Sequence, residues 1–566
     1  MPHAIDRFIS RTHIGYFTME IALRNEIRTY AGGLGVLAGD TARSCADLEI
    51  PVVFVSLASR KGYLRQEIDE NGRQVERPDP WEPRDWSTPL EAMVAIELDG
   101  RRVWIRPWHY VLTCPLGNAV PVILLDTDLE ENSPADREIT HYLYGGDDSY
   151  RLRQEAVLGI GGVRALQALG FDIHTYHLNE GHAALLTMEL LRRHRWPAAA
   201  GKPSIPLCDP EPVLRSCVFT THTPVEAGHD QFPYSVVERV LGDFIELEEL
   251  KRYAGADRCN MTRLALNLSG YVNGVARSHA ETTRGMFPGY QVRAITNGVH
   301  TATWAHSAFA RLYDAHFPQW SHEPDVLVRA DQLSDDEVWK AHQEAKSDLI
   351  RFVAERTGVT LDANKPIIGF ARRMTGYKRP ELLLSDLERL RSIARSYPFQ
   401  AVWAGKAHPR DVEGKRAIER ISAQVRSLRG EIPMAFVPNY DLDVAAHFVA
   451  GADIWLNTPL PPQEASGTSG MKAAVNGVLN LSVLDGWWLE AWIEGVTGWA
   501  IGGPSPERNG RHAQDLYDKL EAEVLPLYYG DRARWMWMMK ESISKVASFF
   551  NSQRMMRRYA TEAYLR

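Results

Sequence analysis

Short runs of apolar and β-branched residues alternate with helix-like segments along most of the chain. Residues 14–20 (IGYFTME) predict a strand, residues 36–48 (VLAGDTARSCADL) a helix, and residues 51–57 (PVVFVSL) a second strand. A strand, a glycine turn, a helix and a strand in this order form a unit that is typical of phosphate-binding proteins. Further strands are expected at 102–108, 119–128, 175–180, 217–224 and 291–300. Each of these runs ends in small or polar residues, and the carboxyl ends of strands are where open α/β sheets bind ligands.

A second series of apolar runs begins after residue 365. It predicts strands at 366–373, 400–407, 434–440, 453–459 and 479–486, with helical segments between them. The stretch near 305–335 indicates a connection, and the chain from about residue 515 onward is typical of helices. We therefore expect an α/β protein with two Rossmann-like domains and a ligand cleft between their strand edges.

Composition and charge exclude several classes of protein. The 566 residues are 45% hydrophobic and 24% charged, and the net charge of −8 argues against a general nucleic-acid binder. No uninterrupted apolar run is long enough to span a bilayer, and the first residues carry no leader signature, so a cytoplasmic protein is expected. Five scattered cysteines without a CxxC pair indicate neither a disulfide framework nor a zinc module.

The stretch 30–40 (YAGGLGVLAGD) places Gly33, Gly35 and Ala38 in a G-x-G-x-x-A pattern between a strand and a helix. Glycines there let backbone N–H groups approach a phosphate at a helix N-terminus. The following strand ends in VSLAS without a carboxylate, which disfavours NAD, and no Gly-Lys-Ser/Thr follows, which excludes a Walker motif. A phosphate site and a purely steric tight turn both stay open.

A basic cluster follows the apolar run PIIGF. Arg372, Arg373, Lys378 and Arg379 lie within eight residues at a strand end. Arginine binds phosphoryl groups as a fork and lysine as a point charge, so an anion site is favoured over a solvated helix start.

Two polar stretches, 177–182 (HLNEGH) and 220–230 (TTHTPVEAGHD), also follow apolar runs. They contain five possible metal ligands, which are His177, Glu180, His182, His222 and His229. Their spacing matches no metal motif, so no metal is expected, and hydrogen bonds to a substrate are the better interpretation. Structural roles for single histidines stay open.

The segment 464–472 (EASGTSGMK) carries Lys472 behind a run of small residues in an apolar context. A lysine against an apolar wall has a lowered pKa and forms an imine with an aldehyde such as pyridoxal phosphate (PLP). From spacing alone, a surface lysine is the better interpretation. Trp487, Trp488 and Trp492 suit sugar stacking, but a core or a domain seam is favoured.

Taken together, these segments resemble the glycogen/α-glucan phosphorylase family. The matching motifs are EASGTSGMK (464–472), GGLG (32–35), RRMTGYKR (372–379) and TNGV (296–299). The similarity runs from Ile14 to the C-terminal helices and is closest to the short bacterial and archaeal type, which shares LDGWW and GWAIG. The chain begins close to the glycine-rich segment, so we expect no regulatory N-terminal extension.

The resemblance implies a GT-B fold, PLP bound as an imine to Lys472, and phosphorolysis of α-1,4-glucan with retention to give α-glucose 1-phosphate. It implies three parts: an N-terminal domain (1–320), a PLP-binding domain (321–520) and C-terminal helices (521–566) that return to the first domain. Cofactor contacts are implied at Gly32, Gly33, Gly35, Lys378, Tyr440, Thr468 and Lys472, substrate contacts at Glu180, His182, His229, Asn297, Glu464, Ser466 and Gly467, and catalytic roles for Lys472, Arg373, Lys378 and His229.

The chain departs from the family pattern at three places. Glu180 stands where the family has a shorter acid, Ser469-Gly470 replaces Gly-Asn, and WWLEAW follows LDG where the large enzymes have ANVE. Two alternatives are a sugar-nucleotide-dependent glucosyltransferase of the glycogen-synthase kind and an inactive glucan-binding protein. The expected partners are α-1,4-glucan or maltodextrin, inorganic phosphate and glucose 1-phosphate, with no nucleic acid or membrane, and a homodimer is possible.

Overall fold

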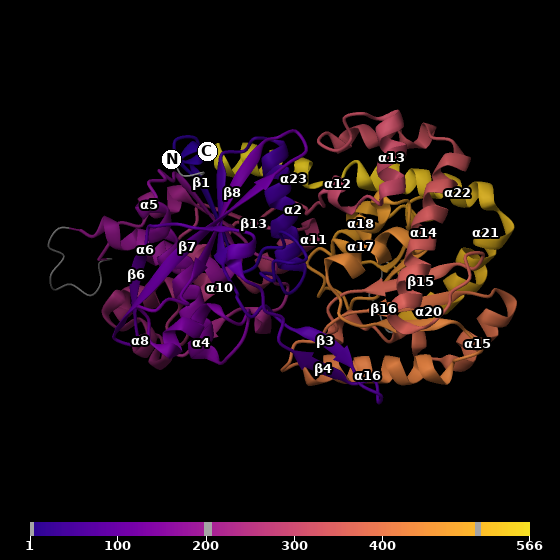
Figure 1. Cartoon of the computed structure of the whole chain (residues 1–566), viewed down its shortest axis with the longest axis horizontal. Helices are drawn as coiled ribbons and strands as arrows, with labels where there is room; N and C mark the ends of the chain where they lie inside the picture. The colour runs from indigo at the N-terminus through magenta and orange to yellow at the C-terminus, as the bar shows by residue number, and fades with distance from the viewer. Residues whose placement is uncertain (1–4, 197–206, 504–510, 566) are drawn as a thin grey trace.

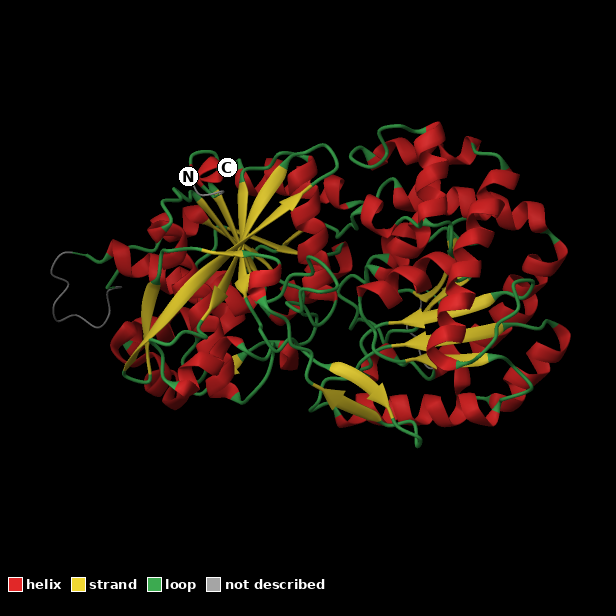
Figure 2. Cartoon of the chain, viewed as in Figure 1, coloured by secondary structure: helices red, strands yellow, loops and turns green. Residues whose placement is uncertain are grey.

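The computed structural model describes residues 5–196, 207–503 and 511–565. It is a mixed α/β protein in which two separate large sheets, both rich in parallel strands, are surrounded by helices (Figure 2). Figure 1 shows that the first half of the chain surrounds one sheet and the second half the other, and that the last helix returns to the first half, so both termini lie close together.

The first sheet has ten strands, in the order β14-β13-β10-β9-β1-β2-β8-β7-β5, with β6 paired to β7. The strands are β1 (Ile14–Thr18), β2 (Val52–Leu57), β5 (Thr88–Pro89), β6 (Val94–Leu98), β7 (Arg101–Thr113), β8 (Ala119–Asp126), β9 (Thr175–Asn179), β10 (Cys217–Thr220), β13 (Tyr271–Gly274) and β14 (Arg293–Ala294). From β14 to β8 all neighbours are parallel, and β7 pairs antiparallel with β5, β6 and β8. Every residue of β1 is buried, as expected for a central strand that is covered on both faces.

The second sheet has six strands, all parallel, in the order β17-β16-β15-β18-β19-β20. They are β15 (Ile367–Ala371), β16 (Gln400–Ala404), β17 (Met434–Val437), β18 (Ile454–Asn457), β19 (Leu479–Val483) and β20 (Gly498–Ile501). The five strands expected in this half are all present, because each is a short apolar run bounded by turn residues.

Helices separate most of the parallel strands. In the first half they are α1 (Asp6–Ile9), α2 (Gly33–Asp47), α3 (Pro134–Arg137), α4 (Asp148–Ala156), α5 (Gly162–Ala168), α6 (Leu185–Leu191), α7 (Glu211–Ser216), α8 (Tyr234–Leu241), α9 (Leu247–Ala254), α10 (Met261–Asn267) and α11 (Arg277–Met286). Those that follow are α12 (Thr301–Trp304), α13 (Ser307–His316), α14 (Asp335–Thr357), α15 (Leu387–Ser396), α16 (Val412–Ser427), α17 (Leu442–Gly451), α18 (Ser469–Val475), α19 (Trp488–Ala491), α20 (His512–Lys519), α21 (Leu525–Gly530), α22 (Arg532–Ser542) and α23 (Ser552–Tyr559). Within the described ranges, none of them is both long and apolar enough to cross a bilayer.

The stretch 305–335 is helical and belongs to the core of the second half, which corrects its interpretation as a connection. Phe309, Leu312, Tyr313 and Phe317 are buried in the same cluster as the second sheet. Relative to Phe309 the other three lie at i+3, i+4 and i+8, which is the pattern of one apolar helix face along α13 and its C-cap, and the surrounding Trp, His and acidic residues obscure it in the sequence.

The C-terminal segment contributes to both halves. Helices α21 and α22 are part of the apolar cluster around the second sheet. From Ser552 onward the chain lies against the first half, where Met555, Met556 and Tyr559 join the cluster that contains α2. The segment 521–566 therefore divides near residue 550.

A small antiparallel hairpin, β3 (Arg65–Ile68) and β4 (Gln74–Arg77), projects from the first half onto the second (Figure 1). The backbone N–H of Gln66 donates to Asn439 Oδ1 at 3.0 Å, and the backbone N–H of Asn439 donates to Gln66 Oε1 at 2.8 Å. Gln74 exchanges two more, each of 2.9 Å, with the backbone of Ala407. Because these donors and acceptors are mutually satisfied and largely buried, the hairpin ties the two halves beside the cavity described below.

Candidate active site

A cavity of about 820 Å³ lies between the two halves. Its walls come from the carboxyl ends of β1, β9 and β10 in the first half and of β15, β16 and β18 in the second. Concave sites at the carboxyl edges of parallel sheets are where such proteins bind ligands. The cavity collects every cofactor, substrate and catalytic residue that the family resemblance implies except Gly35, whereas Arg379 of the basic cluster and His177 lie outside its lining.

Lys472 lies on α18 and lines this cavity with only 7% of its surface exposed. Its Nζ is 3.9 Å from the centre of the Trp304 ring, and it forms no hydrogen bond or ion pair with any residue that the structure describes. Burial lowers the pKa of the Lys472 amine to about 8, which the Asp40 carboxylate partly opposes. Trp304 is fixed in turn, because its Nε1 donates to both Asp40 oxygens at 2.9 and 3.1 Å. A surface position for this lysine is therefore wrong.

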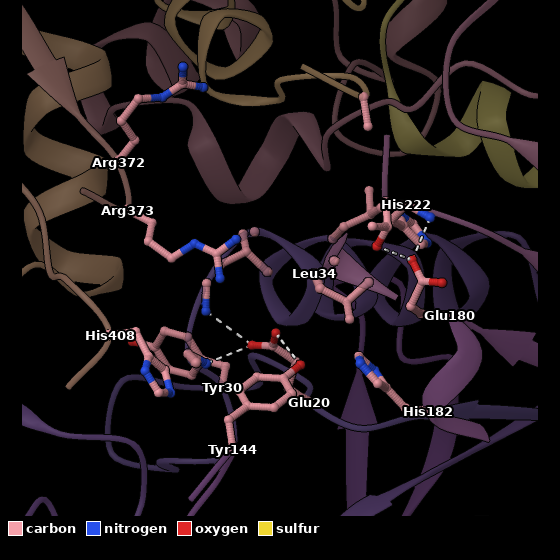
Figure 3. Close-up of a pocket in the computed structure, with 18 of the residues that line it drawn as sticks. Glu20, Tyr30, Leu34, Tyr144, Glu180, His182, His222, Arg372, Arg373 and His408 are labelled. Carbon is pink, nitrogen blue, oxygen red and sulfur yellow. Dashed lines mark hydrogen bonds between the residues drawn. The ribbon is translucent and has the colours of Figure 1, made fainter. Parts of the chain in front are cut away.

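The cations of the basic cluster after β15 lie in two different environments. Lys378 donates to both oxygens of Glu464 at 2.6 Å, and Arg372 contacts the same carboxylate at 3.1 Å. Burial raises the pKa of Glu464, but these two cations outweigh it and hold that pKa below its usual range. Arg373 is exposed to the cavity, and Figure 3 shows its side chain reaching in above Glu20. Of the predicted cations, Arg373 is thus available to an anionic ligand, whereas Lys378 already holds a carboxylate.

The glycine-rich segment forms the opposite wall, at the N-terminus of the 15-residue helix α2. Gly32 and Gly33 line the cavity, and a Cβ atom at either would meet nothing within 4 Å. The Glu20 carboxylate accepts from the N–H groups of Ala31 and Gly32 at 2.6 and 3.0 Å. Gly35 lies behind this pair, where a Cβ would come within 2.6 Å of Glu20 Oε2. The first two glycines therefore leave a helix N-terminus open to an anion, and Gly35 admits Glu20.

The polar residues of the first half surround the neighbouring region, at the right of Figure 3. The Glu180 carboxylate accepts from the backbone of His222 at 2.7 Å and from the Thr223 hydroxyl at 3.0 Å. Glu180 has φ +76°, a strained value for this residue type that is typical of functional sites. His182 lies 3.5 Å from Asp230, and burial lowers the pKa of its imidazole to about 3. His182 is therefore neutral at physiological pH.

Four side chains that line the cavity have a buried polar atom without a hydrogen-bond partner in the described structure. These atoms are His182 Nδ1, His229 Nε2, Asn297 Oδ1 and Ser466 Oγ. Buried polar atoms in native proteins are nearly always paired, so a cluster of unpaired ones around one cavity indicates a polar ligand. Hydroxyl groups of a sugar, which both donate and accept, would satisfy all four.

The remaining predicted residues lie on the second half. Tyr440 and Thr468 line the cavity beside Lys472, and burial raises the pKa of Tyr440 to about 12, so its hydroxyl stays protonated. Gly467 has φ +88°, which favours glycine and lets the chain turn between Ser466 and α18.

Two of the histidines in the stretches 177–182 and 220–230 are engaged in hydrogen bonds with other described residues. His177 hydrogen-bonds Tyr564 and Thr220, and His222 hydrogen-bonds Asn179. The possible metal-ligand cluster found among the described residues is elsewhere, on the surface, and consists of His13, Asp172 and His174.

Comparison with known proteins identifies relatives of this chain. The profile of the carbohydrate phosphorylase family matches residues 208–495. A maltodextrin phosphorylase of Thermococcus litoralis is 40% identical over 595 aligned positions, which cover 97% of this chain and 70% of that protein. The chain belongs to the carbohydrate phosphorylase family. Glycogen phosphorylases of Aquifex aeolicus and Mycobacterium tuberculosis are 36% and 34% identical, covering 97% and 98% of this chain and 86% and 71% of theirs.

Two of the departures from the family pattern, at Gly470 and Trp487, lie next to each other in the structure. In this phosphorylase family member, a Cβ atom at position 470 would come within 2.6 Å of the Trp487 ring and 2.3 Å of Asn480 Oδ1. Asn480 and the tryptophan after LDG therefore both occupy the space of a larger side chain before Met471, which explains the glycine at position 470. Trp487 and Trp488 are 1% and 0% exposed, which confirms their core interpretation.

Several site residues were not predicted. Trp304, Glu20, Tyr144, Arg151, Asp230, Lys406 and His408 all line the cavity. Glu20 directly follows a strand that ends at the cavity, and Lys406 and His408 follow β16, so their positions at strand ends are a signal that sequence reasoning could have used. Trp304 gives no such signal, because only tertiary packing brings it to Lys472.

Proposed function

We propose that this family member is a PLP-dependent α-glucan phosphorylase with two Rossmann-like domains in the GT-B arrangement. The packing supports a first domain that ends before α12 and includes the chain from Ser552 onward, and a second domain between them, in place of boundaries at 320 and 520. The observation that carries the proposal is Lys472, a buried amine without a hydrogen-bond partner among the described residues, facing a cavity that an open helix N-terminus and Arg373 also line. The relatives' names, maltodextrin and glycogen phosphorylase, support the same substrate class.

The residues present fit pyridoxal phosphate. Lys472 would hold its aldehyde in a cavity of about 820 Å³, which Thr468 and Tyr440 line from the second half and Gly32 and Gly33 from the first. When bound, the cofactor supplies a phosphate group with a second pKa of about 6, which holds or passes a proton near neutral pH. A nucleotide-sugar glucosyltransferase has no use for a buried, unpaired lysine, so that alternative is disfavoured. An inactive glucan-binding protein is disfavoured because Lys472, Arg373 and Lys378 are all present in the cavity.

In the proposed reaction, inorganic phosphate gives a proton to the glycosidic oxygen as the C1–O bond breaks. A phosphate oxygen then bonds to C1 on the same face, giving α-glucose 1-phosphate and a glucan shortened by one unit. Arg373 and the N-terminus of α2 stabilise the phosphate charge, since two anions tolerate proximity only among positive groups. His182, His229, Asn297 and Ser466 hold the hydroxyls of the reacting sugar.

Three buried carboxylates at the wall are each already engaged, which favours phosphate over a protein nucleophile. Glu464 is bound by Lys378 and Arg372, Glu180 by backbone and hydroxyl donors, and Glu20 by the glycine-rich segment. A hydrolase needs a free pair of carboxyl groups to act as acid and as base or nucleophile. The proposal includes maltodextrin or α-1,4-glucan, phosphate and glucose 1-phosphate as partners, a cytoplasmic location and a homodimer.

The test is an assay of glucose 1-phosphate from maltodextrin and phosphate, together with an absorbance spectrum of the purified protein before and after addition of PLP. Lys472→Ala should abolish both the imine band and phosphorolysis. Lys365→Ala is a matched control, because Lys365 precedes β15 and pairs with Asp362 at 3.7 Å, outside the cavity. Arg373→Ala should raise the KM for phosphate about ten- to a hundredfold and leave the KM for glucan within about threefold. Glucosyl transfer from a sugar nucleotide, or phosphorolysis that survives Lys472→Ala, would overturn the proposal.

A further inference from the structure

Asp485 follows β19 and is 3% exposed, at the carboxyl edge of the second sheet. Its Oδ2 accepts the backbone N–H of Glu464 at 2.9 Å, and its Oδ1 accepts that of Gly486 at 2.9 Å. Asp485 is not among the described residues that line the cavity. One buried carboxylate thus joins the turn after β19 to the loop that carries Glu464.

The rest of the turn makes the same connection through the backbone. The N–H of Trp487 donates to the Ser466 carbonyl at 2.9 Å. Gly486 has φ +55°, and a Cβ there would lie 2.4 Å from the Ser466 carbonyl oxygen, so the two segments are in direct contact. The loop 464–467 is therefore held at both ends by the turn 485–487.

What the loop presents to the cavity is the Glu464 carboxylate and the Ser466 hydroxyl. Glu464 is fixed at its side chain by Lys378 and Arg372, and at its backbone by Asp485. Ser466 Oγ is one of the buried atoms that lack a partner in the described structure. Because neither side chain can move without the loop, the loop's backbone bonds determine where a sugar would be held.

We propose that Asp485 is a positioning residue for phosphorolysis: it fixes the loop 464–467, and through it the sugar-binding groups of Glu464 and Ser466, without touching the substrate. This inference rests on the proposed phosphorylase activity. Asp485, the acid of the LDG segment, thus has a role that differs from the roles of the residues that line the cavity.

The charges that face Asp485 come from two segments. Glu464 is on the loop itself, and Lys378 and Arg379 follow β15. Ser278 of α11 contacts the turn without charge, at 3.5 Å from the Gly486 carbonyl oxygen. The pKa of Asp485 is raised to about 7, chiefly by burial and also by the Glu464 charge, while the two backbone donors and Lys378 oppose this rise. The ionised carboxylate accepts both N–H groups, whereas the protonated form has one oxygen occupied by hydrogen. The loop should therefore be held more firmly at pH 8 than at pH 6.

The decisive variant is Asp485→Asn, which keeps the shape but presents an amide nitrogen to one of the N–H donors. We expect the KM for glucan to rise about three- to tenfold, the value of one hydrogen bond, with the KM for phosphate unchanged within about twofold. The wild-type KM for glucan should be higher at pH 6 than at pH 8, and the variant should lose this difference. Asp386→Asn is the matched control, because Asp386 accepts one backbone N–H at 2.9 Å at the start of α15, outside the cavity.

Hydrogen exchange of the peptide that spans 464–467 gives a readout without activity. Exchange in Asp485→Asn should be faster than in the wild type, and exchange in the wild type should be faster at pH 6 than at pH 8 after correction for the intrinsic rate. If Asp485→Asn does not fold, this pH comparison on the wild type alone decides, and equal protection at both pH values would overturn the inference. An active wild type with an unchanged KM and pH profile in the variant would also overturn it. An inactive wild type would refute the proposed function instead, while the exchange comparison still tests the role of Asp485.

Discussion

Lys472 should react with an aldehyde at a pH well below that needed by an exposed lysine. Its pKa is about 8 because the amine is buried against Trp304, whereas an exposed lysine has a pKa of about 10.4. At pH 7, roughly a tenth of the Lys472 amines are then neutral, against about 0.04% for an exposed lysine. Since only the neutral amine attacks a carbonyl, this corresponds to about a two-hundredfold gain in reactive amine.

The perturbation that isolates this effect is Asp40→Asn. Asp40 raises the Lys472 pKa and accepts the Trp304 Nε1–H, and asparagine keeps an acceptor there while it removes the charge. The midpoint of PLP uptake with pH should lie near pH 8 in the wild-type apoprotein and move to lower pH in the variant. The unfolded chain binds this proton more tightly than the folded one, so the stability of the apoprotein should rise as the pH increases from about 8 to 10.

The assay is the absorbance of the bound cofactor after its addition to the apoprotein between pH 6 and 10. Lys406→Ala is the informative companion, because burial also lowers the pKa of Lys406 to about 8, but its Nζ donates to the Leu64 carbonyl at 2.8 Å. Lys406→Ala should still take up the cofactor, and Lys472→Ala should not. A wild-type midpoint near pH 10, or uptake that follows Lys406 instead of Lys472, would refute the reasoning.

Two further predictions concern packing and buried charge. Gly470→Asn should lower the free energy of unfolding by about 1–3 kcal/mol and Trp487→Ala by about 3–5 kcal/mol. The double variant should lose about 0.5–1 kcal/mol less than their sum, because removal of the ring relieves its contact with the new side chain, whereas the contact with Asn480 stays. Strictly additive losses in urea unfolding would show that the two positions do not make this contact. Asp453→Asn should lower the unfolding free energy by about 3–5 kcal/mol, because it leaves the wholly buried Lys346 ammonium, 2.9 Å away, without its opposite charge. A loss below about 1 kcal/mol in the same measurement would contradict that interpretation.

Local patterns predicted most of the parallel strands of both halves, though not β13 or β20, because a parallel strand is a short apolar run and each run carries its own polar end. The cavity residues that follow such runs, including Glu180, Arg373 and Lys378, could be proposed for the same reason. The helical character of 305–335 could not be recognised as easily, since its buried Trp320 and its partly or fully exposed histidines resemble the composition of a loop.

Contacts between distant segments were beyond sequence reasoning. Trp304 and Lys472 are 168 positions apart in the numbering and meet only through the packing of α12 on α18. Gly35 shows the complementary difficulty, because its glycine pattern indicates a phosphate site, whereas in the fold the missing side chain makes room for Glu20. A glycine motif shows where the backbone carries no side chain. Which neighbouring residue or ligand fills that space depends on the fold of the whole chain.

The β3–β4 hairpin limits how the two halves can move against each other. Its paired glutamines hold the loops after β16 and β17, so that edge of the entrance behaves as one solid piece with the second half. Any closing motion over a bound chain has to bend the two strands of backbone that lead into and out of the hairpin, rather than slide the sheets apart. The two leads are thus the part of this hairpin in which a movement between the halves would be taken up.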